Sequence, residues 1–185
     1  FLERARSESL VFDDGRLRSA SYDASEGFGL RAVRGEVTGY GHSTEISEAA
    51  LARATETARL AVGAGGGTWS EPPAATNRHL YAEVDPIAGA EFPVKVETLR
   101  AIDAYLRDAD PRVVQVTATV AAGCQEVEIL RPDGTHVRDV RPMARLNVSV
   151  ILEENGRRES GSAGGGGRVG LEGLIDPAAW RERAD

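Results

Sequence analysis

The sequence predicts an α+β protein built from two consecutive mixed units, each a mainly antiparallel sheet with a packed helix. Strand-like runs joined by turn sequences occur between residues 2 and 42 and again between residues 112 and 160. One helical stretch follows the first group of strands and another precedes the second group. Because the strands are grouped rather than alternating with helices, this order favours α+β layers over a doubly wound parallel sheet. We expect the first unit over residues 1–63, a linker over 64–92 and the second unit over 93–185.

The first unit begins with four predicted strands. Asp14-Gly15 stands between two extended runs, and an Asp-Gly pair in that position is a strong signal for a hairpin. Gly35-Glu36 then turns the chain into the last run. The pattern predicts an antiparallel meander with strands at residues 2–12, 16–23, 27–34 and 37–42.

A helix is predicted after these strands, over residues 48–62. Ser47 precedes it, and a serine in that position accepts a hydrogen bond from a backbone N–H group of the first turn. Glycines from Gly63 onward end the helix. Apolar residues at helical spacing predict the face that packs on the sheet. They are Leu51, Ala54, Ala58 and Val62, together with Thr55.

The second unit is predicted to begin with a helix over residues 93–108, which Pro111 ends. Helical spacing divides its residues into two faces. We expect the buried face to contain Val96, Leu99, Ile102 and Leu106, and the solvated face to contain Lys95, Glu97, Arg100 and Asp103.

More strands are predicted after this helix. Pro132-Asp133-Gly134 is typical of a turn, because proline fixes φ and glycine accepts positive φ. The predicted strands cover residues 112–120, 125–130, 135–140 and 143–152, and the last is followed by a turn and a strand ending at Ser160.

A final helix is predicted over residues 176–185, and it stops for no chemical reason. Residue 1 is Phe rather than Met. We therefore expect the chain to be a piece of a longer protein, truncated before a further domain. Apolar residues near the end are expected to contact that missing domain. They are Val169, Leu171, Leu174, Ile175 and Trp180.

Composition restricts the class of protein. Of the 185 residues, 41% are hydrophobic and 28% are charged, which is ordinary for a soluble globular protein. The net charge of −7 gives no support for direct binding of nucleic acid, because domains dominated by phosphate contacts are usually basic. No stretch approaches the roughly 18 apolar residues of a membrane-spanning helix, and we expect no membrane partner. The single cysteine, Cys124, excludes an internal disulfide and fits the reducing cytoplasm.

The residues that most often carry catalysis are scattered. His42, His79 and His136 fall on three different predicted elements, whereas zinc needs convergent ligands in close geometry. We expect each of them to be a surface histidine. Cys124 is expected to be a small buried hydrophobe rather than a nucleophile, and the sequence contains no Gly-x-Ser-x-Gly elbow.

The candidate site is the segment Gly161-Ser-Ala-Gly-Gly-Gly-Gly-Arg168. Four consecutive glycines are costly, because glycine loses more backbone freedom on folding than any other residue. The run does not continue into the Gly-Lys-[Ser/Thr] of a phosphate-binding loop, which disfavours a nucleotide role. Two interpretations remain open. The bare backbone allows a peptide main chain to approach and add as a strand, or it is a flexible connection between sheet and helix.

Five segments, spread over nearly the whole chain, carry a resemblance to a known family. Near the C-terminal end they are Asp139–Val150 and Glu153–Arg168, and upstream they are Glu8–Arg16, Gly27–Tyr40 and Asp110–Val116. Together they closely resemble the TldD branch of the TldD/PmbA (modulator of DNA gyrase) family of zinc metallopeptidases. The glycine-rich run favours TldD over its paralogue PmbA, also called TldE.

The resemblance implies a cytoplasmic zinc metallopeptidase that degrades or trims unfolded peptides and forms a heterodimer with a TldE/PmbA-type subunit. In the family, a His-Glu-x-x-x-His helix and a later cysteine hold the zinc, and the Glu acts as general base for the metal-bound water. Residues 1–185 contain no His-Glu-x-x-x-His, and Cys124 matches no metal-ligand motif. We therefore expect an N-terminal and central region that binds no zinc and is inactive alone. The alternative is a non-catalytic TldE/PmbA-like partner or a protein-interaction module.

No residue of the chain is expected to be catalytic or to bind metal. The best candidates for lining the path of a peptide substrate are Gly164, Gly165, Gly166 and Gly167, whose backbone can pair with the peptide. Arg168 is expected to meet a carboxylate or a peptide carbonyl group. A surface salt bridge is the alternative for Arg168.

Overall fold

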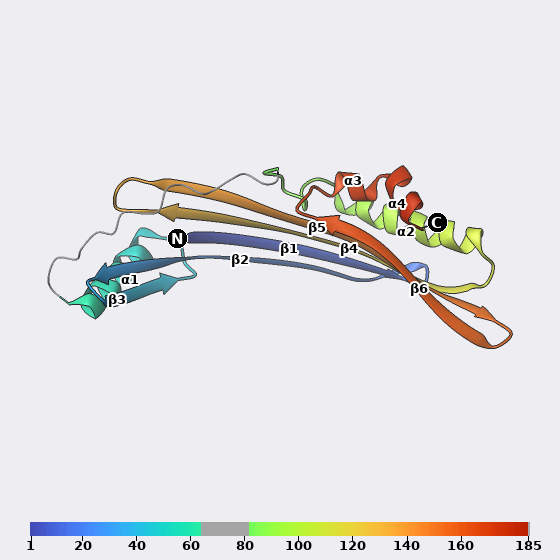
Figure 1. Cartoon of the computed structure of the whole chain (residues 1–185), viewed down its shortest axis with the longest axis horizontal. Helices are drawn as coiled ribbons and strands as arrows, with labels where there is room; N and C mark the ends of the chain where they lie inside the picture. The colour runs from blue at the N-terminus through green and yellow to red at the C-terminus, as the bar shows by residue number, and fades with distance from the viewer. Residues whose placement is uncertain (64–81, 185) are drawn as a thin grey trace. The chain divides into compact units, whose positions relative to one another are not determined.

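The computed structural model describes residues 1–63 and 82–184 (Figure 1). Three strands and a helix come first along the chain, and a helix, three strands and two short helices follow. The first group contains β1 (Leu2–Asp13), β2 (Arg16–Arg34), β3 (Val37–Ser43) and α1 (Glu48–Val62). The second group contains α2 (Phe92–Ala109), β4 (Val113–Leu130), β5 (His136–Glu154), β6 (Arg157–Gly167), α3 (Glu172–Ile175) and α4 (Pro177–Ala184).

The six strands form one antiparallel sheet in the order β3-β2-β1-β4-β5-β6, so β3 and β6 are its edge strands. This arrangement, with helices packed on the sheet, confirms the α+β class. The strands that were expected in two sheets are joined, because β1 and β4 pair as neighbours. The two strands lie about a hundred residues apart in sequence, and such pairing leaves no local signal in the chain.

Contacts divide the chain into two compact units that interleave along the sequence. Unit 1 contains the described residues 1–5, 24–63 and 126–139. Unit 2 contains the described residues 6–23, 82–125 and 140–184. The predicted boundaries at residues 63 and 92 stay a prediction, since part of the predicted linker lies outside the described residues.

Three predicted interruptions of strands are wrong. Strand β2 runs without a break through residues 24–26, β4 runs through Gly123 and β5 runs through Pro142. The reason is visible in the burial of alternate residues, which continues across Gly123 and Pro142 and keeps one side of each strand in the core. These buried residues are Val116, Ala118, Val120, Ala122 and Cys124 on β4, and Val140, Pro142, Ala144 and Leu146 on β5.

The hairpin predicted at Asp14-Gly15 is confirmed. Both residues have positive φ, 50° and 79°, which is the backbone of a tight hairpin turn. Asn155 and Gly156 form a matching turn between β5 and β6, with φ of 52° and 79°. Asparagine, aspartate and glycine adopt this conformation at the lowest cost, and for this reason the two turns are readable from the sequence.

Helix α1 has the predicted limits, but its buried face differs. Ser47 accepts a hydrogen bond from the Ala50 backbone N–H at 3.2 Å, which confirms the predicted cap. The buried residues are Ala50, Ala54 and Ala58, whereas Leu51 is 39% exposed. The helix lies so close to the backbone of β3 that only small side chains fit between them.

Helix α2 buries the predicted Leu99, Ile102 and Leu106 in the core of unit 2. Two residues predicted to be solvated are buried instead: Lys95 is 1% exposed and Asp103 is 7% exposed. Both have partners inside unit 2. The Lys95 ammonium group donates hydrogen bonds to the Glu8 carboxylate and to the Ile87 carbonyl oxygen, and the Asp103 carboxylate accepts one from Arg107.

The C-terminal helices complete the same core. Leu171, Leu174 and Trp180 are buried within unit 2, and the Trp180 ring contacts Tyr105 of α2 edge-on with centroids 5.5 Å apart. The prediction that these three residues face a missing domain is therefore wrong. Val169, which is 47% exposed, is the member of that group that remains on the surface.

Candidate functional site

Strand β6 contains all four glycines of the run and lies at the edge of the sheet. Among the described strands it pairs with β5 alone, in an antiparallel register that places Gly164 opposite Asn147 and Gly167 opposite Ala144. Its residues from Arg157 to Gly164 are exposed. The run is therefore neither a flexible connection nor a phosphate-binding loop, because it is an ordered strand in an antiparallel pair.

Two of the four glycines are required by the neighbouring strand. A Cβ atom at Gly164 would overlap Asn147 Oδ1 and lie 2.8 Å from the Leu146 carbonyl oxygen. A Cβ atom at Gly166 would overlap the Ala144 carbonyl oxygen. Since backbone atoms cannot yield cheaply, these positions accept only glycine while β6 stays in register.

Gly167 differs from these two positions. No atom of residues 1–63 or 82–184 outside its chain neighbours lies within 4 Å of the place where its Cβ would be, and its φ lies outside the region that favours glycine. Packing inside the chain therefore does not explain the absence of a side chain there. Arg168 follows β6 in a bend and is exposed, so the residue comes after the paired part of the strand.

A polar hollow of about 310 Å³ adjoins the glycine run. It lies on the sheet face opposite the core, because its residues alternate with buried ones on β4 and β5. The residues that supply its polar groups are Thr117, Thr119, Arg145, Asn147, Ser149 and Ser162. Sequence reasoning missed this hollow, although the alternation Arg145-Leu-Asn-Val-Ser149 is the signal of a strand with a polar face.

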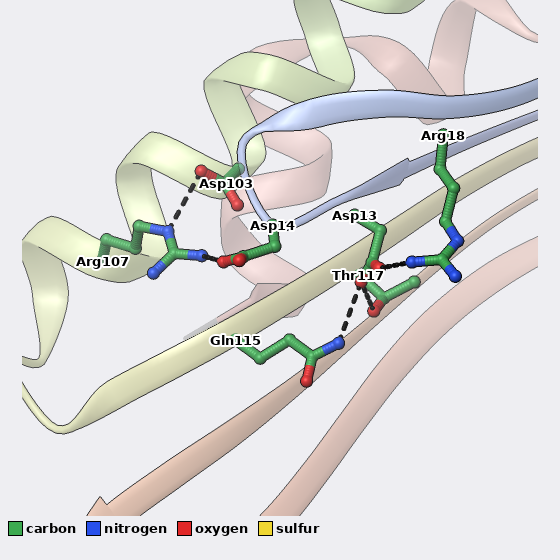
Figure 2. A network of polar contacts seen from close by, with 7 residues as sticks. All are labelled: Asp13, Asp14, Arg18, Asp103, Arg107, Gln115 and Thr117. Atoms are coloured by element: carbon green, nitrogen blue, oxygen red, sulfur yellow. Dashed lines mark hydrogen bonds and ion pairs between the residues drawn. The ribbon is translucent and has the colours of Figure 1, made fainter.

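A network of hydrogen bonds surrounds Asp13 at the end of β1 (Figure 2). Thr117 Oγ1 donates to Asp13 Oδ1 at 2.7 Å, Gln115 Nε2 donates to the same oxygen at 3.0 Å, and Arg18 Nη1 lies 3.0 Å from Oδ2. The bonds from Gln115 and Thr117, and then the Arg18 charge, hold the pKa of Asp13 below its ordinary value of 3.8. This carboxylate is therefore ionised at neutral pH.

The adjacent residue, Asp14, joins a second network. Arg107 of helix α2 forms ion pairs with Asp14 at 2.6 Å and with Asp103 at 3.2 Å (Figure 2). One oxygen of Asp103, Oδ1, is buried without a hydrogen-bond partner among the described residues. The Arg107–Asp14 pair links α2 to the β1–β2 turn, so the network has a structural role.

The residues that sequence reasoning considered for metal binding do not come together. His136 Nε2 lies 2.9 Å from Glu128 Oε2 in unit 1, His42 lies on β3, and Cys124 is 3% exposed in unit 2. His79 lies outside the described residues. Within residues 1–63 and 82–184, no three His, Cys, Asp or Glu side chains are grouped to hold a metal ion. The described residues therefore do not fit a zinc site.

Two domain profiles match the chain in order along the sequence. A profile described as "PmbA/TldA metallopeptidase domain 1" matches residues 1–62, and one described as "PmbA/TldA metallopeptidase central domain" matches residues 85–185, more than half of the chain. The chain belongs to the TldD/PmbA family. The resemblance carried by the segments from Glu8 to Arg168 is thereby confirmed.

Known members of the family show how much of a TldD-type protein is present. The protein named Metalloprotease TldD homolog from Haemophilus influenzae is 35% identical over 175 residues, which make up 93% of this chain and 36% of that protein. The protein of the same name from the Acyrthosiphon pisum strain of Buchnera aphidicola is 32% identical over 88% of this chain and 34% of its own length. The chain thus spans about a third of the length of these relatives.

Solved structures of low sequence identity share the fold. A candidate modulator of a DNA gyrase from Thermotoga maritima superposes with a TM-score of 0.73 at 17% identity, covering 99% of this chain and 42% of that one. TldE from Thermococcus kodakarensis superposes with a TM-score of 0.59 at 15% identity, covering 97% of this chain and 43% of that one. No helix among the described residues is long and apolar enough to cross a membrane.

Proposed function

We propose that residues 1–185 are the N-terminal and central part of a TldD-type zinc metallopeptidase that degrades or trims unfolded peptides. The observation that carries this proposal is the ordered match to the two family domains, at residues 1–62 and 85–185. The 35% identity to a metalloprotease TldD homolog supports the TldD branch. By contrast, the likeness to TldE is one of fold, at 15% identity.

In this proposal the C-terminal half of β6 lines the path of the peptide. An edge strand presents unpaired N–H and C=O groups, and an extended peptide can add to it as a further strand. Glycines at 164–167 leave that edge without side chains, so the peptide main chain can approach. We propose that Arg168, which follows the strand, meets a carboxylate or a carbonyl oxygen of the peptide.

The metal belongs to another part of the longer protein in this proposal. Zinc, when bound there, activates a water molecule for attack on the peptide bond. The described residues of this chain supply no ligand set, and its sequence contains no His-Glu-x-x-x-His. The role of this chain is to position the peptide, and we expect the chain alone to be inactive.

A TldE/PmbA-type subunit is the proposed partner and the cytoplasm the proposed location. The fold likeness to TldE supports the choice of partner. The same likeness supports the alternative function, a non-catalytic TldE/PmbA-like subunit or an interaction module. The sequence relatives favour the TldD branch over this alternative.

The proposal is tested by comparing the chain with the longer protein. Each is purified, its zinc content is measured by plasma mass spectrometry, and cleavage of an unfolded peptide is followed by chromatography with and without a TldE-type subunit. We expect stoichiometric zinc and metal-dependent cleavage in the longer protein, and neither in residues 1–185. A longer protein that binds no zinc would favour the non-catalytic alternative, and cleavage by residues 1–185 would refute the division of roles.

A further inference from the structure

The polar hollow beside β6 is lined by an arginine that is hydrogen-bonded to a neighbouring side chain. Arg145 Nε donates a hydrogen bond to Asn147 Oδ1 at 3.0 Å, and both residues lie on the same face of β5. Asn147 Oδ1 in turn occupies the space that a Cβ of Gly164 would fill. Gly164, the Asn147 amide and the Arg145 guanidinium group therefore lie next to one another. This bond uses Nε of Arg145, so its two terminal nitrogens are the remaining donors of a side chain that lines the hollow.

The other polar groups of the hollow can donate hydrogen bonds as well. Thr119, Ser149 and Ser162 each bring a hydroxyl group, and the amide nitrogen of Asn147 remains a donor because its oxygen accepts from Arg145. The Thr117 hydroxyl is already committed to Asp13. Such a set matches a ligand that offers oxygen acceptors in a plane.

Among the described residues that line the hollow, Arg145 alone carries a charge, although the net charge of the chain is −7. Asp13 is the carboxylate linked to the hollow through Thr117, and Arg18 neutralises it at 3.0 Å. The Arg145 charge therefore has no opposing carboxylate in this network. A guanidinium group presents its nitrogens as a planar fork that matches a carboxylate or a phosphate in two places, and the single positive charge here equals the single negative charge of a carboxylate.

We propose that this hollow is a carboxylate-binding site, in which the terminal nitrogens of Arg145 hold a carboxylate of an extended peptide and the hydroxyl groups and Asn147 amide complete the site. The carboxylate assignment depends on the hollow alone, whereas the peptide that bears it rests on the proposed function. The carboxylate comes either from the C-terminus of the peptide or from an acidic side chain.

The test is a titration of the ¹⁵N-labelled chain with short acetylated Gly/Ser peptides, followed by amide chemical shifts in NMR spectra. One peptide ends in a free carboxylate, the second in an amide, and the third in an amide with one internal Glu. We expect the first or the third to shift the signals of Asn147, Ser149 and Ser162, and to bind about tenfold more tightly than the second, as for one charge-assisted pair. The peptide that binds identifies the source of the carboxylate.

Variants locate the site. Arg145→Gln should reduce the affinity for the carboxylate peptide to that of the second peptide, and Arg145→Lys should give an intermediate value because the fork is lost while the charge remains. Arg157→Gln is the matched control, since Arg157 is an exposed strand arginine paired with Glu159 elsewhere on β6. The spectrum of each variant reports its folding directly.

Equal affinity for all three peptides, or an unchanged affinity in Arg145→Gln, would overturn the proposal. Neither result depends on zinc or cleavage, which are measured on the longer protein. Competition by sodium acetate supports the carboxylate class, whereas inorganic phosphate displacing the peptide more effectively than acetate would contradict it.

Discussion

Each edge strand of the sheet contains two glycines, at alternate positions, that a neighbouring element requires. The neighbouring element differs between the two strands. In β3, a Cβ at Gly39 or Gly41 would overlap a carbonyl oxygen of helix α1, at Ala58 and Ala54. In β6, the corresponding overlap at Gly164 and at Gly166 is with β5. The glycines of β3 are fully explained by a helix inside the chain.

The two strands differ because β6 contains a glycine that packing does not require. Strand β3 has α1 packed on its glycine face, whereas β6 is largely exposed and continues to Gly167, where internal packing does not require glycine. Where packing requires a glycine, its presence gives no information about function. One that packing does not require is the better marker of a surface where another chain approaches.

The largest expected effect is that of Gly41→Ala. The added Cβ would lie 2.7 Å from the Ala54 carbonyl carbon, and helix α1 would have to move away from β3. We expect the free energy of unfolding to fall by about 3 kcal/mol, at the upper end of overpacking costs. Urea denaturation measures it. Gly29→Ala in the paired strand is the matched control, because its Cβ meets nothing within 4 Å; an equal loss in both variants would contradict this explanation.

Gly166→Ala is expected to lower the free energy of unfolding by less, about 1–2 kcal/mol. Its Cβ would lie 2.8 Å from Arg145 Cα, but an edge strand has one neighbour and can shift outward. Thermal and urea unfolding measure the change. A cost equal to that of Gly41→Ala would show that β6 is held as firmly as β3, and no cost at all would mean that β5 does not require glycine there.

Asp13→Asn is expected to lower the free energy of unfolding by about 1 kcal/mol at neutral pH, because two hydrogen bonds and an ion pair to the carboxylate are weakened. The folded-state pKa of Asp13 lies below the ordinary value of 3.8. The contribution is therefore complete above pH 3.8 and is lost as the pH falls through the folded-state pKa. The stabilities of wild type and variant should converge as the pH falls below 3.8, and a difference that does not shrink in acid would contradict the role of this ionised carboxylate.

Gly167→Ala is expected to have the smallest effect on stability. Its Cβ meets no atom within 4 Å, and alanine reduces the entropy of the unfolded chain. We expect a change between zero and a gain of about 1 kcal/mol in the free energy of unfolding. Gly161→Ala, whose Cβ would lie 3.6 Å from Val150 Cγ2, should behave alike. A decrease of more than about 1 kcal/mol in the free energy of unfolding would show that packing requires glycine at position 167 as well.

Local signals allowed much of the fold to be predicted. The cap at Ser47, the turn at Asp14-Gly15 and the limits of both long helices depend on neighbours in sequence, and all are confirmed. The burial of Lys95 could not be predicted in this way. Its partner Glu8 lies 87 residues away in the sequence, and a lysine in a helix is predicted to be solvated unless such a partner is known.

The candidate site divides in the same way. The glycine run was found because four consecutive glycines are unusual in any chain. Which of them packing requires could not be predicted, because that depends on the register with β5 and on the Asn147 side chain. The hollow was missed because Thr117 and Arg145 come from strands whose residues meet only in the folded sheet.

The most direct test of the central claim, that the open glycine edge of β6 receives the peptide, is the kinetics of Gly167→Ala in the longer protein with an unfolded peptide substrate. Gly161→Ala, in the same strand but outside the run, is the control. We predict that Gly167→Ala raises KM about tenfold, equivalent to about 1.4 kcal/mol of lost binding, while the free energy of unfolding is not reduced and the control keeps the wild-type KM. A wild-type kcat/KM in Gly167→Ala would contradict the account.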